Sequence, residues 1–239
     1  MPVDSSTWRP TKYLMRDGKL NAGLVRPASR LMANLVAEYY TTAIPRYARG
    51  ALLDLGCGEA PLYAAYGACA GSVTTSDWHD GPHVDVVSDL TAELSFEDGR
   101  FDTVILSDVL EHLPNPSVVM GEVARILAPG GTLLLNVPFL YTIHEAPHDY
   151  HRYTEFALTR MVEEAGLTLV ELDRLGGLPE VLVDLVSKGV SAAPVVGPAI
   201  AGVLQRLGWS WHRSGLGRRF ARKTTAYTPS GYALAATKD

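Results

Sequence analysis

The stretch Leu52-Leu53-Asp54-Leu55-Gly56-Cys57-Gly58 decides the fold of this chain of 239 residues. A short apolar run ends there in two glycines that are separated by one residue. A ligand can approach a backbone closely where no Cβ atom intrudes, and a turn from strand to helix can require positive φ. Gly56 and Gly58 meet both needs, so we expect a strand, a bare turn and a helix whose first amides face a ligand. A glycine pair alone also fits a tight turn without a ligand.

Outward from this turn, short apolar runs alternate with helical patterns, which is typical of βαβ units around a parallel sheet. The expected strands are Ala51–Leu55, Ser72–Ser76, Val84–Val87, Phe101–Leu106, Thr132–Val137, Leu167–Leu172 and Gly231–Thr237. The expected helices are Pro27–Tyr40, Pro61–Ala70, Ser117–Leu127 with Asn115 as its cap, Thr154 to Gly166, and Glu180–Ser187. The pattern therefore predicts an α/β fold with a doubly wound sheet.

One domain with additions is the simplest organisation for a chain of this length. We expect an N-terminal helical extension over 1–50, a core over 51–174, a less regular C-terminal insertion over 175–229, and the last strand within 230–239.

Charge and composition exclude several classes of protein. The net charge of -5 and the absence of an Asn/Asp-Pro-Pro-Tyr/Phe run disfavour a nucleic-acid partner. The two cysteines lack a CxxC spacing, and the N-terminus lacks the pattern of a signal peptide, so we expect a cytoplasmic protein. The most apolar stretch, residues 189–204, is shorter than the roughly 20 residues of a spanning helix, so we expect no stable membrane insertion.

Acidic and small residues follow four consecutive expected strands. Asp77 lies nineteen residues beyond Gly58, Asp89 follows the third strand, and Ser107-Asp108 ends the fourth. Strand ends on the carboxyl side of an open α/β sheet form its ligand-binding edge, and a carboxylate after the second strand holds a ribose in nucleotide folds. Carboxylates suit a cofactor with a sulfonium and an ammonium group, whereas the loop lacks the third glycine of the dinucleotide motif.

Residues 51–137 resemble a class I S-adenosylmethionine-dependent methyltransferase. Five segments carry the resemblance, namely LLDLGCG at 52–58, TSDW at 75–78, SDL at 88–90, FDTVILSDVLEHL at 101–113 and LAPGGTLLLNVP at 127–138. The resemblance implies a Rossmann-like, mostly parallel seven-stranded sheet whose last strand is antiparallel. It also implies S-adenosylmethionine as the cofactor.

The resemblance further implies roles for the residues at the first two strand ends. Asp54, Gly56 and Gly58 would hold the methionine end of the cofactor, mainly through their backbone. Asp77 would bind the ribose hydroxyls, with Trp78 beside the adenine.

The later strand ends complete the implied cofactor site. Asp89 and Leu90 would contact the adenine edge, and the backbone carbonyl of Ser107 would accept from the cofactor ammonium. His112 is placed near the cofactor, in a binding or a packing role.

The segment 139–154, FLYTIHEAPHDYHRYT, follows the fifth strand and is rich in titratable groups. His144 to His148 matches the HExxH motif of zinc proteases, but Pro147 disfavours the helix that this motif requires. We expect His144 or His148 to act as a base, and Arg152 to anchor the loop or an acidic part of the substrate. No bound metal is expected, although a non-helical metal site in this loop stays open.

The same segment is similar to a His-x-x-Pro-x-Asp-x-x-Arg-Tyr-Thr pattern that many bacterial methyltransferases of this type carry after the fifth strand. That likeness indicates membership of the group and says little about the substrate.

The function expected from these features is transfer of a methyl group to a small-molecule acceptor, most simply onto oxygen. Methylation of nitrogen or carbon, or cofactor binding by a regulator without turnover, are the alternatives. Segment 1–50 and segment 175–229 are expected on the acceptor side. The apolar stretches of the latter could cover the cleft, form a homodimer or touch a membrane surface.

Overall fold

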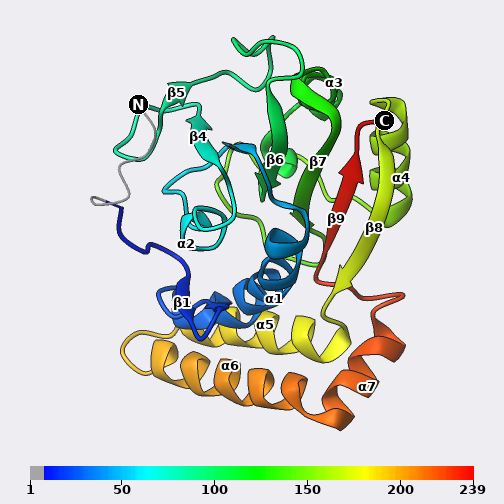
Figure 1. Cartoon of the computed structure of the whole chain (residues 1–239). Coiled ribbons are helices and arrows are strands. Elements are labelled where there is room, and N and C mark those ends of the chain that lie inside the picture. Colours follow the sequence, from blue (N-terminus) through cyan, green and yellow to red (C-terminus); the bar gives the residue numbers. More distant parts are fainter. Residues whose placement is uncertain (1–7) are drawn as a thin grey trace.

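A computed structural model of the chain describes residues 8–239 (Figure 1). Its strands are β1 (Leu14–Arg16), β2 (Lys19–Asn21), β3 (Ala51–Leu55), β4 (Ser72–Asp77), β5 (Val86–Val87), β6 (Phe101–Ser107), β7 (Leu127–Pro138), β8 (Thr168–Leu175) and β9 (Gly231–Thr237). Its helices are η1 (Pro27–Ser29), α1 (Arg30–Tyr47), α2 (Tyr63–Tyr66), η2 (Leu110–His112), α3 (Pro116–Ile126), α4 (Glu155–Glu164), α5 (Leu178–Ser191), α6 (Gly197–Arg213) and α7 (Gly215–Thr224).

The central sheet has seven strands in the order β5-β4-β3-β6-β7-β9-β8. The pairs from β5 to β7 are parallel, whereas β9 runs antiparallel to both β7 and β8. The predicted doubly wound, mostly parallel sheet with an antiparallel last strand is therefore confirmed. The carboxyl ends of the parallel strands meet at one edge, where such sheets bind ligands.

Two apolar cores cover the two faces of the sheet, because successive side chains of a strand point to opposite faces. Leu53 packs in the core that contains residues of α3 and α4. Leu52, its neighbour, packs in the core that contains residues of α1 and α2. This burial on both faces explains why the strands read as continuous apolar runs.

Two local predictions about helices were wrong. The helix predicted over 61–70 is reduced to α2, with turns on both sides of its four residues. Asn115 makes no capping bond to α3, because its side chain accepts a hydrogen bond from Ser117 Oγ. Thr154 does cap α4, accepting from the amide of Ala157, and Gly166 follows that helix with φ +78°.

The segment 175–229 is not the less regular insertion that the sequence analysis expected. It forms α5, α6 and α7, which Figure 1 shows as a group of helices beyond α1, with α6 farthest from the sheet. Glycines and prolines obscured the helical repeat of this segment. In the N-terminal extension, the hairpin β1–β2 was also missed. It turns at Asp17-Gly18, both with positive φ, which is a typical hairpin turn.

In the part of the chain that the structure describes, no helix combines the length and the apolar character needed to cross a bilayer.

Candidate active site

The turn after β3 is tied to the end of β4. The amides of Gly56 and Cys57 donate to the carbonyl of Ser76, at 2.8 and 3.0 Å. Gly56 has φ +76°, and a Cβ atom on it would lie 2.5 Å from Cγ2 of Val109. Glycine is therefore required at position 56 for steric reasons as well as for its backbone conformation.

The second glycine of the turn faces open space and Asp77. Gly58 has φ +52°, and nothing lies within 4 Å of a Cβ atom built on it. Its amide donates to Oδ2 of Asp77 at 2.7 Å. The structure thus brings the predicted glycine turn and the predicted ribose carboxylate together, while the exposed side chain of Trp78 follows Asp77 directly.

The other acidic positions differ in their surroundings. Asp54 is buried and accepts a 2.6 Å bond from the hydroxyl of Tyr66. Burial raises the pKa of Asp54 to about 7, and the Tyr66 bond opposes that rise. Its side chain is occupied, so the expected contact with a cofactor falls to its backbone. Asp89 is exposed and accepts from Thr91, which lowers the pKa of Asp89, while Leu90 beside it is buried.

A polar network that the sequence analysis did not predict joins the ends of β6 and β7. Ser107 Oγ and the hydroxyl of Tyr40 both donate to Oδ1 of Asn136, at 2.7 and 2.8 Å. The side-chain Nδ2 of Asn136 donates to Asp108, which also forms an ion pair with Lys12 at 3.2 Å. The sequence signal for this network was Asn136, a polar residue within an otherwise apolar strand, because a buried polar side chain needs hydrogen-bond partners. Lys12 had none, because only the tertiary structure brings it to this edge.

The histidine-rich loop is held against η2 by backbone and ionic contacts. The amide of Tyr150 donates to the carbonyl of Glu111 at 2.8 Å. Arg152 forms a two-pronged pair with Asp149, whose Oδ2 also accepts from the amide of His144 at 2.9 Å. Arg152 lowers the pKa of Asp149. Of the two roles expected for Arg152, the structure therefore fits the anchoring of the loop.

Residues 144–148 are not helical, so the geometry of a zinc protease is absent from this motif. The two histidines separate instead. His144 faces η2, whereas the ring of His148 lies 5.2 Å from that of Trp78 and its Nδ1 is 3.2 Å from the hydroxyl of Tyr150.

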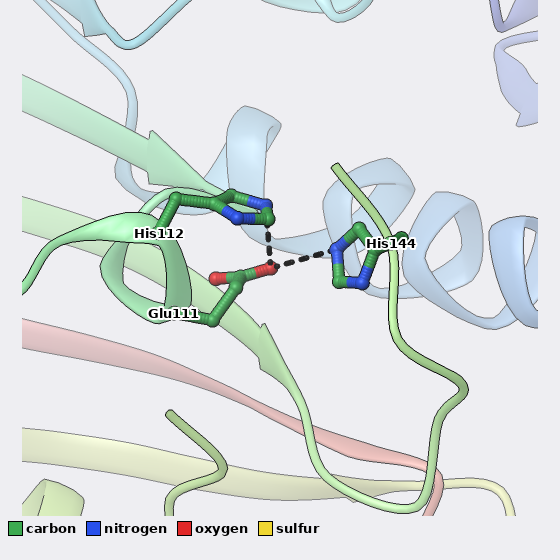
Figure 2. Close-up of side chains that lie close together, drawn as sticks. All are labelled: Glu111, His112 and His144. Carbon is green, nitrogen blue, oxygen red and sulfur yellow. Dashed lines mark ion pairs between the residues drawn. The ribbon is translucent and has the colours of Figure 1, made fainter. Parts of the chain in front are cut away.

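Glu111, His112 and His144 form a compact cluster, which Figure 2 shows with both imidazoles directed at one carboxylate oxygen. Oε1 of Glu111 lies 3.7 Å from Nε2 of His112 and 3.6 Å from Nε2 of His144. Glu111 is 0% exposed, and neither of its oxygens has a hydrogen-bond partner. Burial raises the pKa of Glu111, and Glu111 in turn raises the pKa of His144. One ligand atom from each residue lies within 4.8 Å of the others, so these residues could hold a metal ion.

A pocket opens beside this cluster, at the ends of β6 and β7 and against η1 and α1. Its polar wall includes Lys12, Asp108, His112, Asn136, Tyr141, His144 and Glu145, and its apolar wall includes Val25, Met32, Ala33, Val36, Val137, Pro138 and Leu175. His112, predicted near the cofactor, thus lies at this pocket, and His148 does not line it. Of the two segments expected on the acceptor side, the N-terminal one contributes lining residues. The C-terminal one contributes Leu175, at the end of β8, whereas helices α5 to α7 contribute none.

The doubly wound sheet and the glycine turn facing Asp77 are typical of proteins that bind a nucleotide or nucleoside cofactor. The chain belongs to the methyltransferase domain family, whose match extends over residues 26–172. It is a class I S-adenosylmethionine-dependent methyltransferase, and S-adenosylmethionine is its cofactor.

The curated relatives agree with this family. The chain is 29% identical to a ubiquinone biosynthesis O-methyltransferase of Xanthomonas euvesicatoria, over 56% of this chain and 69% of that one. It is 31% identical to a protein of the same name from Thiobacillus denitrificans, over 51% of this chain and 66% of that one. Among solved structures, the [4+2]-cyclase SpnF has a similar fold, with a TM-score of 0.56 at 19% identity over 96% of this chain and 86% of that one.

Proposed function

We propose that this enzyme transfers the methyl group of S-adenosylmethionine to a hydroxyl oxygen of a small molecule. The pocket beside Glu111, His112 and His144 carries the proposal, because it places titratable groups at the edge of the sheet that also holds the glycine turn. Such groups beside a cofactor cleft are enriched in catalysis.

The chemistry of transfer accounts for this arrangement. Methyl transfer is an in-line displacement at the sulfonium methyl carbon, so the enzyme mainly has to position the acceptor. A hydroxyl also has to lose its proton, and a titratable cluster lowers the barrier to that step. Of the two candidate bases, His144 lines the pocket, so we assign the activation of the acceptor to His144 and its partner Glu111.

The names of the curated relatives support oxygen as the acceptor atom, since both are O-methyltransferases. The pocket supports a small acceptor with an apolar body and a polar end, because apolar residues of α1 and β7 face Lys12 and the cluster across it. Methylation of nitrogen or carbon and a regulator without turnover are the competing outcomes.

Labelled cofactor tests this function directly. The purified enzyme is incubated with methyl-labelled S-adenosylmethionine and fractionated bacterial metabolites, and products that gain a labelled methyl group are identified by mass spectrometry and NMR. We expect the label in a methoxy group. A label on nitrogen or carbon would reject the oxygen assignment. Bound cofactor without any labelled product from all fractions would favour the regulator.

A further inference from the structure

Both imidazoles of the cluster turn a nitrogen toward Oε1 of Glu111, which has no hydrogen-bond partner. Nδ1 of His112 lies 2.9 Å from the carbonyl oxygen of His148. A carbonyl oxygen only accepts, so Nδ1 carries the hydrogen and Nε2 of the neutral ring presents its lone pair. That lone pair faces the Glu111 carboxylate.

His144 has the same arrangement. Its Nδ1 lies 3.3 Å from the carbonyl of Thr142 and 3.4 Å from Oδ2 of Asp149, both of which accept. In the neutral ring, Nε2 therefore presents its lone pair to Glu111 as well. A proton on one imidazole would satisfy one of these contacts, and protons on both would set two cationic rings against one carboxylate, whereas a single metal cation at the centre would satisfy both contacts.

We propose that Glu111, His112 and His144 bind one divalent transition-metal ion, with Zn²⁺ as the best match to two imidazoles and one carboxylate. Ligands about 2.1 Å from a tetrahedral ion are roughly 3.4 Å apart. The separations of 3.6 and 3.7 Å from Glu111 come close to that value, and all three ligand atoms lie within 4.8 Å of one another. Metal-binding histidines donate their other nitrogen to a carbonyl or carboxylate, as both rings do here.

This site extends the proposed function, on which its catalytic role rests. Three protein ligands leave a coordination position open, and His112 and His144 also line the acceptor pocket. The acceptor hydroxyl would bind at that position, where the ion would favour loss of its proton to solvent. The oxygen then bonds to the methyl carbon as the carbon–sulfur bond breaks, and its electron pair returns to sulfur, which leaves the neutral thioether.

Metal binding is measured without reference to activity. The protein is stripped with a chelator and titrated with ZnCl₂ by calorimetry, and with CoCl₂ by visible absorption. We expect one site per chain with micromolar or tighter affinity, and loss of at least a hundredfold in Glu111→Gln and His144→Ala. His148→Ala, in the same loop, is the matched control and should bind as the wild type does.

The outcomes separate the site from the function. Absence of binding at millimolar metal, or binding that survives in Glu111→Gln and His144→Ala, would overturn the metal site while leaving the methyltransferase intact. Metal binding with no dependence of turnover on the metal would reject the role in hydroxyl activation.

Helices α5 and α6 bury polar side chains and expose apolar ones, the reverse of the usual arrangement in a soluble protein. Their buried positions include Glu180, Asp184, Ser187, Gln205 and several glycines. Their exposed positions are large and apolar, namely Leu182, Leu185, Val186, Val196, Ile200, Val203, Leu207 and Trp211, and α7 adds Leu216 and Phe220. Monomeric proteins rarely expose a continuous apolar face of this kind.

Three of the buried polar side chains of these helices have partners, whereas the hydroxyl of Ser187 has none. Glu180 contacts Nδ1 of His212 at 2.9 Å, and Asp184 pairs with Lys188 at 2.6 Å. Gln205 donates to the carbonyl of Ala28 and accepts from the amide of Leu31. These contacts hold the polar side chains on the inner face of the helices. On the outer face, positions 196, 200, 203, 207 and 211 form one apolar stripe along α6.

Charge indicates what covers this stripe. Both acidic residues of 178–224 are buried, whereas the basic residues Arg206, Arg213, Arg218, Arg219, Arg222 and Lys223 are exposed. An apolar stripe bordered by cations, in a chain of net charge -5, matches an anionic lipid surface. We propose that α5 to α7, which lie outside the family match, dock on an anionic membrane surface.

Vesicle flotation tests the docking. We expect binding to vesicles of phosphatidylcholine with phosphatidylglycerol, and at least tenfold weaker binding to phosphatidylcholine alone. Ile200→Ser/Leu207→Ser and Arg219→Glu/Lys223→Glu should each weaken binding at least tenfold. Phe156→Ser, at a side chain 77% exposed on α4, and Arg16→Glu/Lys19→Glu are the controls and should bind normally.

Three results would overturn the proposal. They are absence of vesicle binding, equal binding to both lipid compositions, and a dimer in solution that Ile200→Ser/Leu207→Ser dissolves without any vesicle binding. The last would make the stripe an interface between two copies of the chain.

Discussion

Nε2 of His144, on the loop after β7, lies 3.6 Å from Oε1 of Glu111 in η2. The two residues are 33 positions apart and belong to separate motifs, yet the loop that carries His144 is fastened to η2 by backbone bonds to the carbonyl of Glu111. The contact joins a fully buried carboxylate to a side chain that lines the pocket. This contact joins the segment after β6, which carries Glu111, to the histidine-rich loop.

Removing either partner of this contact should lower turnover. We expect His144→Ala and Glu111→Gln to reduce kcat by about 10²–10⁴, the usual contribution of a positioned proton-transfer group. The dissociation constant of S-adenosylmethionine should stay unchanged, because neither residue belongs to the predicted cofactor set. Steady-state kinetics and calorimetry measure both quantities. Full turnover in both variants would show that the cluster plays no part in the reaction.

Gly56 should not tolerate a side chain. Gly56→Ala forces a Cβ atom to 2.5 Å from Val109 at φ +76°, so we expect a loss of about 2–4 kcal/mol in the free energy of unfolding from strain and overpacking. Gly121→Ala, on α3 with open space around it, is the matched control and should stabilise the protein by about 0.5–1 kcal/mol. Urea unfolding compares the two. Equal effects would contradict the steric argument.

Asp77 is predicted to hold the ribose of the cofactor. Asp77→Ala should weaken S-adenosylmethionine binding at least tenfold, equivalent to ~1.4 kcal/mol for a lost charge-assisted bond. Asp77→Asn retains an acceptor for the Gly58 amide, so any loss of cofactor affinity in this variant reports on the negative charge and the ribose contact. The exposed Asp80, three residues further on, supplies the control Asp80→Ala. An unchanged dissociation constant in Asp77→Ala would reject the ribose assignment.

His212 should make stability depend on pH. Burial opposes its charge, but Glu180 and Glu38 outweigh that effect and raise the pKa of His212 from 6.5 to about 9. The charged ring therefore stabilises the folded state fully below pH 6.5, and this contribution is lost as the pH rises through 9. Arg174, Arg218 and Arg222 line the same hollow.

Thermal unfolding between pH 6 and 10 checks this dependence. We expect Tm of the wild type to fall by a few degrees more than that of His212→Asn, since ~1 kcal/mol corresponds to about 2–4 °C for a chain of this size. His79→Asn, at an exposed histidine, should follow the wild-type profile. Parallel profiles for the wild type and His212→Asn would refute the coupling.

The central fold was predictable because its signals are local. Strands buried on both faces are apolar throughout, and the turns between them carry glycines and acids at fixed spacing, so the order of βαβ units follows from the sequence. The turn after β3 was predictable for the same reason, since the sequence Gly56-Cys57-Gly58 supplies glycine where positive φ and close packing require it. Of the helices of 175–229, only α5 was predicted, over Glu180–Ser187; α6 and α7 were not, because their glycines and the prolines before and within α6 obscure the helical repeat.

The sequence by itself determined the class of the protein, its cofactor and the order of the strands whose ends carry the predicted cofactor residues. Only the tertiary structure decided which titratable groups meet: it placed His144 and His112 on Glu111, brought Lys12 to Asp108, and paired Arg152 with Asp149. The physical reason is range. Backbone conformation and apolar periodicity act over a few neighbouring residues, whereas a site depends on contacts between segments that only the packed sheet brings together.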